Sequence, residues 1–187
     1  MSRVLTLALS AALALGAAAP VANAEDGVAF MERFSGKWVG SGQLLVGGSI
    51  EFACELKGNP NAGPSTFGMT GICRMGAMGA SIHAQIRYNA ETDSYYGAFL
   101  GGAEGDGVDL VGTRAGEGFS LKLVRGSTQG RLTAETSSPD QMKVVIYYRD
   151  VRRDRELPVV AMALSRTESA ASRAGSNLAG RSTYPMD

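Results

Sequence analysis

From residue 37 to residue 166, hydrophobic and polar residues alternate along short segments, which clusters of Gly, Asn, Asp or Pro separate. Ile82, Ala84 and Ile86, for example, fall on one side of an extended chain, opposite His83 and Gln85. A period of two with one polar face is typical of half-buried antiparallel strands. The pattern predicts about ten strands, at Lys37–Leu45, Ser49–Lys57, Thr66–Met75, Ala80–Tyr88, Ser94–Leu100, Val108–Arg114, Phe119–Val124, Gly130–Thr136, Gln141–Arg149 and Pro158–Arg166.

A helical spacing is found only before these strands, where Phe30, Met31 and Phe34 predict a short helix over 26–34. The segment 58–65, rich in Pro and Asn, predicts a longer loop. Glycines inside strands indicate bulges or sharp bends, which a small closed barrel requires; they are Gly71, Gly97 and Gly112. The predicted fold is therefore all-β, a single antiparallel β-barrel of about 8–10 strands with a short N-terminal helix. An open sandwich is the alternative.

Both ends of the chain differ from the alternating region. Arg3, an apolar run over 4–19 and the small residues at 21–24 predict a secretory signal peptide cleaved after Ala24, with an uncleaved membrane anchor as the alternative. After Arg166 the composition is mainly Ser, Ala, Gly and Arg, which cannot bury enough apolar surface to become ordered. We therefore expect a signal peptide at 1–24, a β-barrel domain at 25–166 and a disordered C-terminal tail at 167–187, in a protein secreted across the inner membrane of a bacterium into the periplasm.

Charge narrows the classes of partner. The chain has 18 Lys and Arg residues against 18 Asp and Glu residues, and its formal net charge is zero. This balance gives no indication of a basic surface for nucleic acid or for a membrane, and we expect no nucleic-acid partner. The basic run at 152–155 contains Asp154 and is expected to be a solvated turn. No segment after the signal is apolar for long enough to be a transmembrane helix.

The chain has two cysteines, Cys54 and Cys73. An even number in an exported chain predicts a disulfide. Cys54 shares the apolar face of Phe52 and Leu56, and Cys73 shares that of Met69. Both thiols therefore point to the same side if the two segments form a hairpin, as a cross-strand bridge requires. A metal site is the alternative, but it lacks further ligands of suitable spacing, and we expect no metal.

The segment 34–42 reads Phe-Ser-Gly-Lys-Trp-Val-Gly-Ser-Gly. A short helix leading into Gly-x-Trp on the first strand resembles the start of lipocalin-like (calycin) barrels, and Gly-x-Trp-x-Gly-x-Gly resembles that of nitrobindin-type ten-stranded barrels. The resemblance implies that Trp38 packs at the closed end of the barrel and that the interior binds a small hydrophobic molecule. In nitrobindin-type barrels a histidine late in the chain ligates haem iron. The only histidine here is His83, on a polar strand face, so we expect no haem and no other cofactor.

A ligand would contact the apolar face of the strands. The candidate ligand-binding residues are Trp38, Phe52, Phe67, Met69, Phe99, Phe119, Leu121, Ile146 and Tyr148. Small residues expected to point inward favour residual space; these are Gly71, Ala84, Ala134 and Ala161. A filled core and an open cavity remain equal alternatives.

The sequence offers little catalytic chemistry. A triad or a metal-hydrolase centre needs a base that a single histidine on a polar face does not provide, so we expect no enzyme activity. A carboxylate enzyme would need two acids converging in one pocket, and an outward Glu51, Glu55 and Glu135 would count against it. The acidic glycine loop at 101–109 offers oxygens to Ca²⁺ but lacks the spaced carboxylates of a calcium loop, and a turn is the favoured interpretation.

The sequence therefore predicts a periplasmic, lipocalin-like barrel that binds a small apolar molecule. The alternative is a structural or interaction protein of the cell envelope, with a filled barrel and an envelope protein as partner. Exposed aromatic residues on an edge strand, such as Tyr95 or Tyr147, would favour that alternative.

Overall fold

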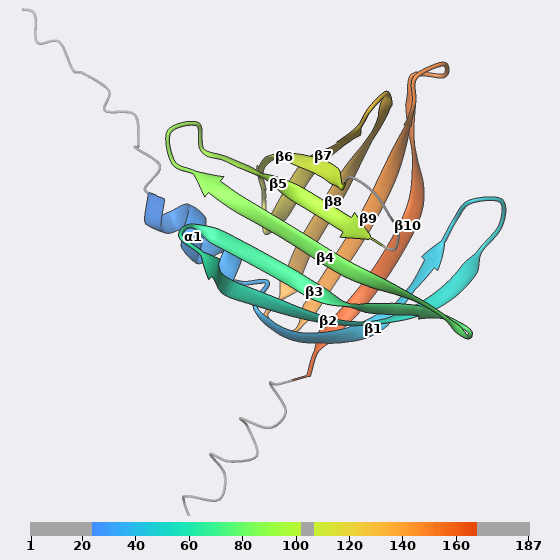
Figure 1. Cartoon of the computed structure of the whole chain (residues 1–187), viewed down its shortest axis with the longest axis horizontal. Helices are drawn as coiled ribbons and strands as arrows, with labels where there is room; N and C mark the ends of the chain where they lie inside the picture. The colour runs from blue at the N-terminus through green and yellow to red at the C-terminus, as the bar shows by residue number, and fades with distance from the viewer. Residues whose placement is uncertain (1–23, 102–106, 168–187) are drawn as a thin grey trace, which may run out of the picture.

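The computed structural model describes residues 24–101 and 107–167, which form one helix and a closed barrel of ten strands (Figure 1). The helix is α1 (Ala24–Glu32). The strands are β1 (Gly36–Leu44), β2 (Ile50–Gly63), β3 (Thr66–Met75), β4 (Met78–Asn89), β5 (Ser94–Gly101), β6 (Val108–Ala115), β7 (Gly118–Arg125), β8 (Thr128–Ser138), β9 (Gln141–Asp150) and β10 (Arg155–Arg166). The predicted signal peptide, the centre of the acidic glycine loop and residues 168–187 of the predicted tail lie outside the described residues.

Each strand pairs antiparallel with the next, and β1 closes the barrel by pairing antiparallel with β10. The predicted all-β barrel with a short helix is confirmed, and the open sandwich is wrong. Nine of the ten predicted strands agree with the observed ones to within three residues at each end. No helix in the described ranges is long and apolar enough to cross a membrane.

The predicted loop at 58–65 is largely strand, because β2 continues to Gly63. Its pairing with β3 shifts register between Asn59 and Gly63, and the Asn59 side chain accepts a hydrogen bond of 3.0 Å from the backbone of Asn61. Beyond Gly58, β2 no longer pairs with β1. A strand with one free side tolerates proline, which is why Pro60 does not end it.

Helix α1 covers one end of the barrel, which we call the closed end (Figure 1). Phe30, Met31 and Phe34 are buried, as the helical spacing predicts. The rings of Phe30 and Phe34 contact that of Phe119 on β7, with centroids 5.0 and 4.7 Å apart. Aromatic side chains bury large areas and favour such tilted and edge-on contacts. The helix is therefore held as an apolar plug in the barrel end.

Trp38 and Arg166 join the first and last strands at the same end. They are direct partners in the β1–β10 ladder, and Trp38 is fully buried. The indole N–H of Trp38 donates a 3.0 Å hydrogen bond to the carbonyl of Phe34. The Arg166 guanidinium lies over the indole and donates to the carbonyls of Arg33, Ser35 and Pro139. The position of Trp38 agrees with what the calycin resemblance implies.

Cys54 and Cys73 form a disulfide between β2 and β3. They are direct partners in the antiparallel ladder, with Cα atoms 4.1 Å apart. The predicted pairing and the predicted shared face are confirmed.

The glycines at 71, 97 and 112 are not bulges, since the strand pairing runs through all three without a shift. A Cβ at Gly97 would lie 1.9 Å from the carbonyl oxygen of Gln85, and one at Gly112 would lie 2.0 Å from that of Ser120. Neighbouring backbone therefore approaches these positions too closely for any side chain.

Candidate ligand-binding cavity

The inward side chains of the barrel line a cavity of about 110 Å³. Every lining residue is apolar: Phe34, Leu56, Phe67, Met69, Cys73, Ile82, Ala84, Ile86, Phe99, Leu110, Phe119, Leu121, Leu132, Ala134, Met142, Val144, Ile146 and Met162. A dry space of this kind attracts apolar molecules, because their transfer from water is favourable and no polar group is left unpaired.

Aromatic rings packed next to α1 form the floor of the cavity. Phe34, Phe67 and Phe119 line it, and behind them lie Tyr88 and Tyr95, whose rings are 5.1 Å apart. The Tyr95 hydroxyl donates to the carbonyl of Gly27 at 3.1 Å, and the Tyr88 hydroxyl donates to Asp93 at 2.9 Å. The polar atoms of this layer thus have partners at the closed end and leave hydrocarbon facing the cavity.

Burial changes the acidity of both tyrosines. Loss of solvation raises the pKa of Tyr95 to about 12. Burial also raises the pKa of Tyr88, and the neighbouring Asp93 carboxylate raises it further. Both phenols stay neutral at physiological pH, so the cavity floor carries no charge.

Small side chains create the space. Ala84 on β4 and Ala134 on β8 line the cavity, as predicted for inward alanines. Ala161 does not, and its predicted inward position is wrong: its neighbour Met162 lines the cavity, while Ala161 belongs to the outer face of β10. The residues around Ala161 are apolar on both faces, so alternation does not reveal its direction.

The structure brings six of the nine predicted ligand-binding residues together around the cavity; they are Phe67, Met69, Phe99, Phe119, Leu121 and Ile146. The other three lie elsewhere. Trp38 is enclosed at the closed end beneath Arg166. Phe52 is half-buried beside Gly42, and Tyr148 is 45% exposed at the opposite end of the barrel.

Several lining residues were not singled out from the sequence. Five of them lie on strand faces that alternation predicts to point inward, so the sequence did indicate their direction; they are Leu56, Ile82, Ile86, Leu132 and Val144. Phe34 gave no such signal, because it follows the helix and reaches the cavity only through the docking of α1.

A second hollow, of about 500 Å³, opens at the end of the barrel away from α1. Its lining mixes apolar and polar side chains: Val108, Leu123, Arg125, Thr128, Gln129, Gly130, Ile146, Tyr147, Tyr148 and Val159. Ile146 lines both this hollow and the inner cavity. An amphipathic molecule can therefore place an apolar part beyond Ile146 and a polar part near Arg125 and Gln129.

Charged side chains lie outside the cavity. Arg131 on β8 donates two hydrogen bonds to Glu156 on β10, at 2.5 and 2.9 Å, and its guanidinium lies over the Tyr147 ring. These bonds lower the pKa of Glu156. His83 is exposed on the outer face of β4, as predicted. Within 24–101 and 107–167, no three His, Cys, Asp or Glu side chains are placed to hold a metal ion.

The geometry defines a class: a ten-stranded antiparallel barrel of the calycin-like fold, closed by a helix and hollow inside. Several solved structures share this fold. The crystal structure of Rv2717c from M. tuberculosis is similar with a TM-score of 0.60 and 16% identity, covering 76% of this chain and 98% of that one. The structure of the S-type phycobiliprotein lyase CPES from Guillardia theta is similar with a TM-score of 0.53 and 13% identity, and the match covers 75% of this chain and 92% of that one.

At these identities the likeness shows the fold alone. No protein-family model and no curated protein sequence matches the chain. The calycin-like fold expected from the Gly-x-Trp motif is confirmed.

Proposed function

We propose that this chain is an exported barrel protein that binds a small apolar molecule in its interior and performs no chemistry on it. The observation that carries the proposal is the cavity of about 110 Å³, whose lining side chains are all apolar. Engineered apolar cavities of about 150 Å³ take up benzene or xenon, so this space suits a single ring or a short hydrocarbon chain. A larger ligand extends past Ile146 into the outer hollow.

A non-catalytic role is supported by where the acids lie. A carboxylate mechanism needs two acids converging on the bound molecule. Glu51, Glu55 and Glu135 are exposed, and Glu55 pairs with Arg74 on the outer face. The residues lining the cavity offer hydrocarbon and sulfur atoms to a ligand, none of which is an acid or base at neutral pH.

Export is supported by the predicted signal peptide and by the disulfide, since structural disulfides persist in oxidising compartments. The intact mass of the protein recovered from the periplasm of its own bacterium tests this step. A chain beginning at Glu25 is expected, and a chain retaining residues 1–24 in the cytoplasm would contradict it.

The alternative of a structural envelope protein has less support. A structural envelope protein would be expected to have a filled interior and exposed aromatic residues on an edge strand. The interior is hollow, the barrel has no edge strand, and Tyr95 is buried against α1. Tyr147 is half-buried beneath Arg131.

Calorimetric titration with straight-chain primary alcohols of increasing length tests the binding. Each methylene transferred from water contributes about 0.8 kcal/mol, so affinity is expected to rise about fourfold per carbon until the cavity is full, and then to level off. Ala84→Leu places a larger side chain in the cavity and should abolish binding. Ala163→Leu, on the exposed outer face of β10, is the matched control and should bind like the wild type. Binding without chain-length dependence, or equal binding by both variants, would contradict the proposal.

A further inference from the structure

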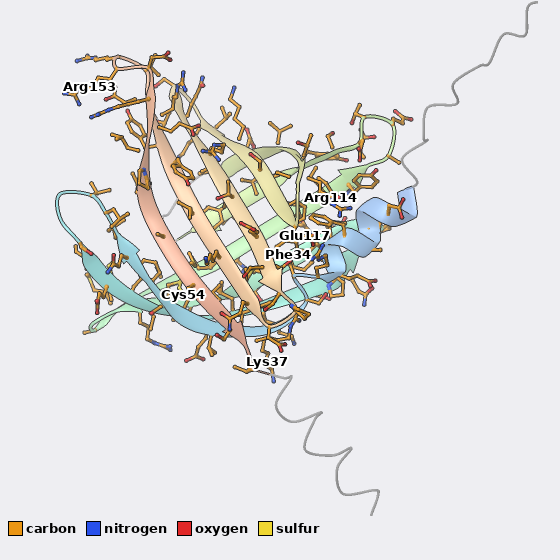
Figure 2. All side chains as sticks on the ribbon, turned by 180° about the vertical axis from the view of Figure 1, so that it is seen from behind. Phe34, Lys37, Cys54, Arg114, Glu117 and Arg153 are labelled. Carbon is orange, nitrogen blue, oxygen red and sulfur yellow. A yellow bond between two sulfur atoms is a disulfide. The ribbon has the colours of Figure 1, made fainter. Side chains whose placement is uncertain are left out.

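The large apolar side chains that remain exposed gather at the open end of the barrel. Within the described residues nine large hydrophobic side chains are exposed, and six of them belong to the strand ends and connections away from α1: Val46, Ile50, Met78, Leu100, Tyr148 and Val151. We call this set the rim. Figure 1 shows that the β1–β2, β3–β4 and β9–β10 connections point away from α1, and Figure 2 shows Arg153 at the end opposite Phe34 and Glu117.

These side chains stay in water after folding and therefore contribute little to the stability of the folded chain. Val151 is 70% exposed and Met78 is 69% exposed, each at a hairpin connection with space for a polar residue. Exposed apolar side chains that gather at one end of a barrel are typical of an interaction surface. Single exposed residues on the outer wall, such as Val111, are ordinary.

Basic side chains accompany the apolar ones at one connection of this end. At the open end, the β9–β10 connection places Arg152 and Arg153 beside Val151. Its single acid, Asp154, pairs with Arg149, and Arg153 pairs with Asp150.

Three exposed arginines at this end remain for an external partner. Arg152 and Arg155 are exposed, and neither has an ion-pair partner in the described part of the chain; Arg125 at the β7–β8 connection is in the same situation. Glu104 and Asp106, in the β5–β6 connection, lie outside the described residues. A few arginines at one end do not change the balance of the total charge, which is why composition gave no indication of a membrane surface.

We propose that the rim binds the surface of an anionic lipid bilayer, with Val151, Met78 and Val46 entering the headgroup region and Arg152 and Arg155 contacting lipid phosphates. Apolar groups that enter the interface together with basic groups that remain at headgroup level are the combination by which peripheral proteins bind such surfaces. The inference is independent of the proposed function, although a bilayer is also a phase that concentrates apolar molecules at the mouth of the cavity.

Co-sedimentation of the mature protein with vesicles tests the proposal. The vesicles contain phosphatidylcholine alone, or phosphatidylcholine with about one-third phosphatidylglycerol. Wild-type protein is expected to bind the anionic vesicles and to lose affinity as salt is raised. Arg152→Gln with Arg155→Gln should weaken this binding about tenfold or more, since each arginine contributes about fivefold near an anionic surface.

Substitution of two exposed valines distinguishes binding through the rim from nonspecific binding by other exposed apolar side chains. Val151→Asp should reduce the partition coefficient about tenfold or more, because it removes an apolar side chain that would enter the headgroup region and adds an anion. Val111→Asp, at a valine 47% exposed on the outer wall, should leave it unchanged. Fluorescence of Trp38, which is buried far from both sites, verifies that the variants are folded.

Three results would overturn the proposal: no binding of wild type to anionic vesicles, equal loss in Val111→Asp and Val151→Asp, or a dimer in sedimentation velocity that Val151→Asp dissociates. The last result would make the rim an interface between copies of the chain. The cavity-filling Ala84→Leu variant should bind vesicles like the wild type. The proposals of ligand binding and of membrane binding can therefore be refuted independently of each other.

Discussion

The guanidinium carbon of Arg166 lies 4.2 Å from the centroid of the Trp38 ring, and this contact joins the last strand of the barrel to the first. The same guanidinium donates to backbone carbonyls of the segment between α1 and β1 and of the β8–β9 connection. One side chain therefore fixes the closing strand pair, the end of the helix and a neighbouring hairpin.

Replacement of Arg166 should destabilise the whole barrel. Arg166→Ala leaves partly buried carbonyls without their charged donor and uncovers Trp38, so the free energy of unfolding should fall by about 2–3 kcal/mol. Arg166→Lys keeps the charge but loses the planar fork and should recover only part of the loss. Urea denaturation followed by Trp38 fluorescence measures the change. Arg155→Ala on the exposed β9–β10 hairpin is the control, and an equal effect of the two alanine variants would show that the Arg166 contacts contribute nothing special.

Removal of the Cys54–Cys73 disulfide should lower stability without changing the fold. The bridge closes a loop of 19 residues in sequence separation, for which the chain-entropy model gives about 3 kcal/mol. Cys54→Ala with Cys73→Ala avoids placing a hydroxyl in the apolar interior. Denaturation of the wild type with and without reductant, beside the double variant, gives the difference. A reductant effect on the double variant, or none on the wild type, would refute this explanation.

Tyr95 should make the barrel sensitive to alkaline pH. Its pKa is about 12 in the folded chain, against an ordinary value of 10.0, so its neutral form is the one that the fold favours. The stability that it contributes is complete below pH 10 and is lost as pH rises through 12. Absorbance titration of phenolate ionisation should show late-titrating tyrosines, and their number should fall by one in Tyr95→Phe, because the pKa of Tyr88 is raised as well. Tyr96→Phe, at an exposed residue on the same strand, is the control. An unchanged number of late-titrating tyrosines in Tyr95→Phe would contradict the prediction.

The fold was predictable because the alternation of inward and outward side chains along a strand can be seen in a few neighbouring residues. Ile82, Ala84 and Ile86 differ from their neighbours in polarity, and period two alone places them on one face. The disulfide followed from the same parity at Cys54 and Cys73. Closure of the sheet was less visible, since the pairing of Trp38 with Arg166 joins residues at opposite ends of the domain.

The site was predictable only in part, for two physical reasons. Parity says which residues face inward but not how far along the barrel they lie, so Tyr148 and Phe52 could not be separated from Phe119. Where both faces are apolar, as around Ala161, parity itself is lost. Tyr95 was considered as an exposed residue although it shares the inward direction of Phe99 on the same strand, and the docking of α1 completes its burial.

Native mass spectrometry of the protein purified from the cells that naturally produce it tests the central claim most directly. Wild-type protein is expected to retain an additional mass that, after extraction, proves to be a small molecule with an apolar part, and the Ala84→Leu variant from the same cells should lack it. Wild type and variant both at the bare chain mass, or both retaining the same polar molecule, would contradict ligand binding in the cavity.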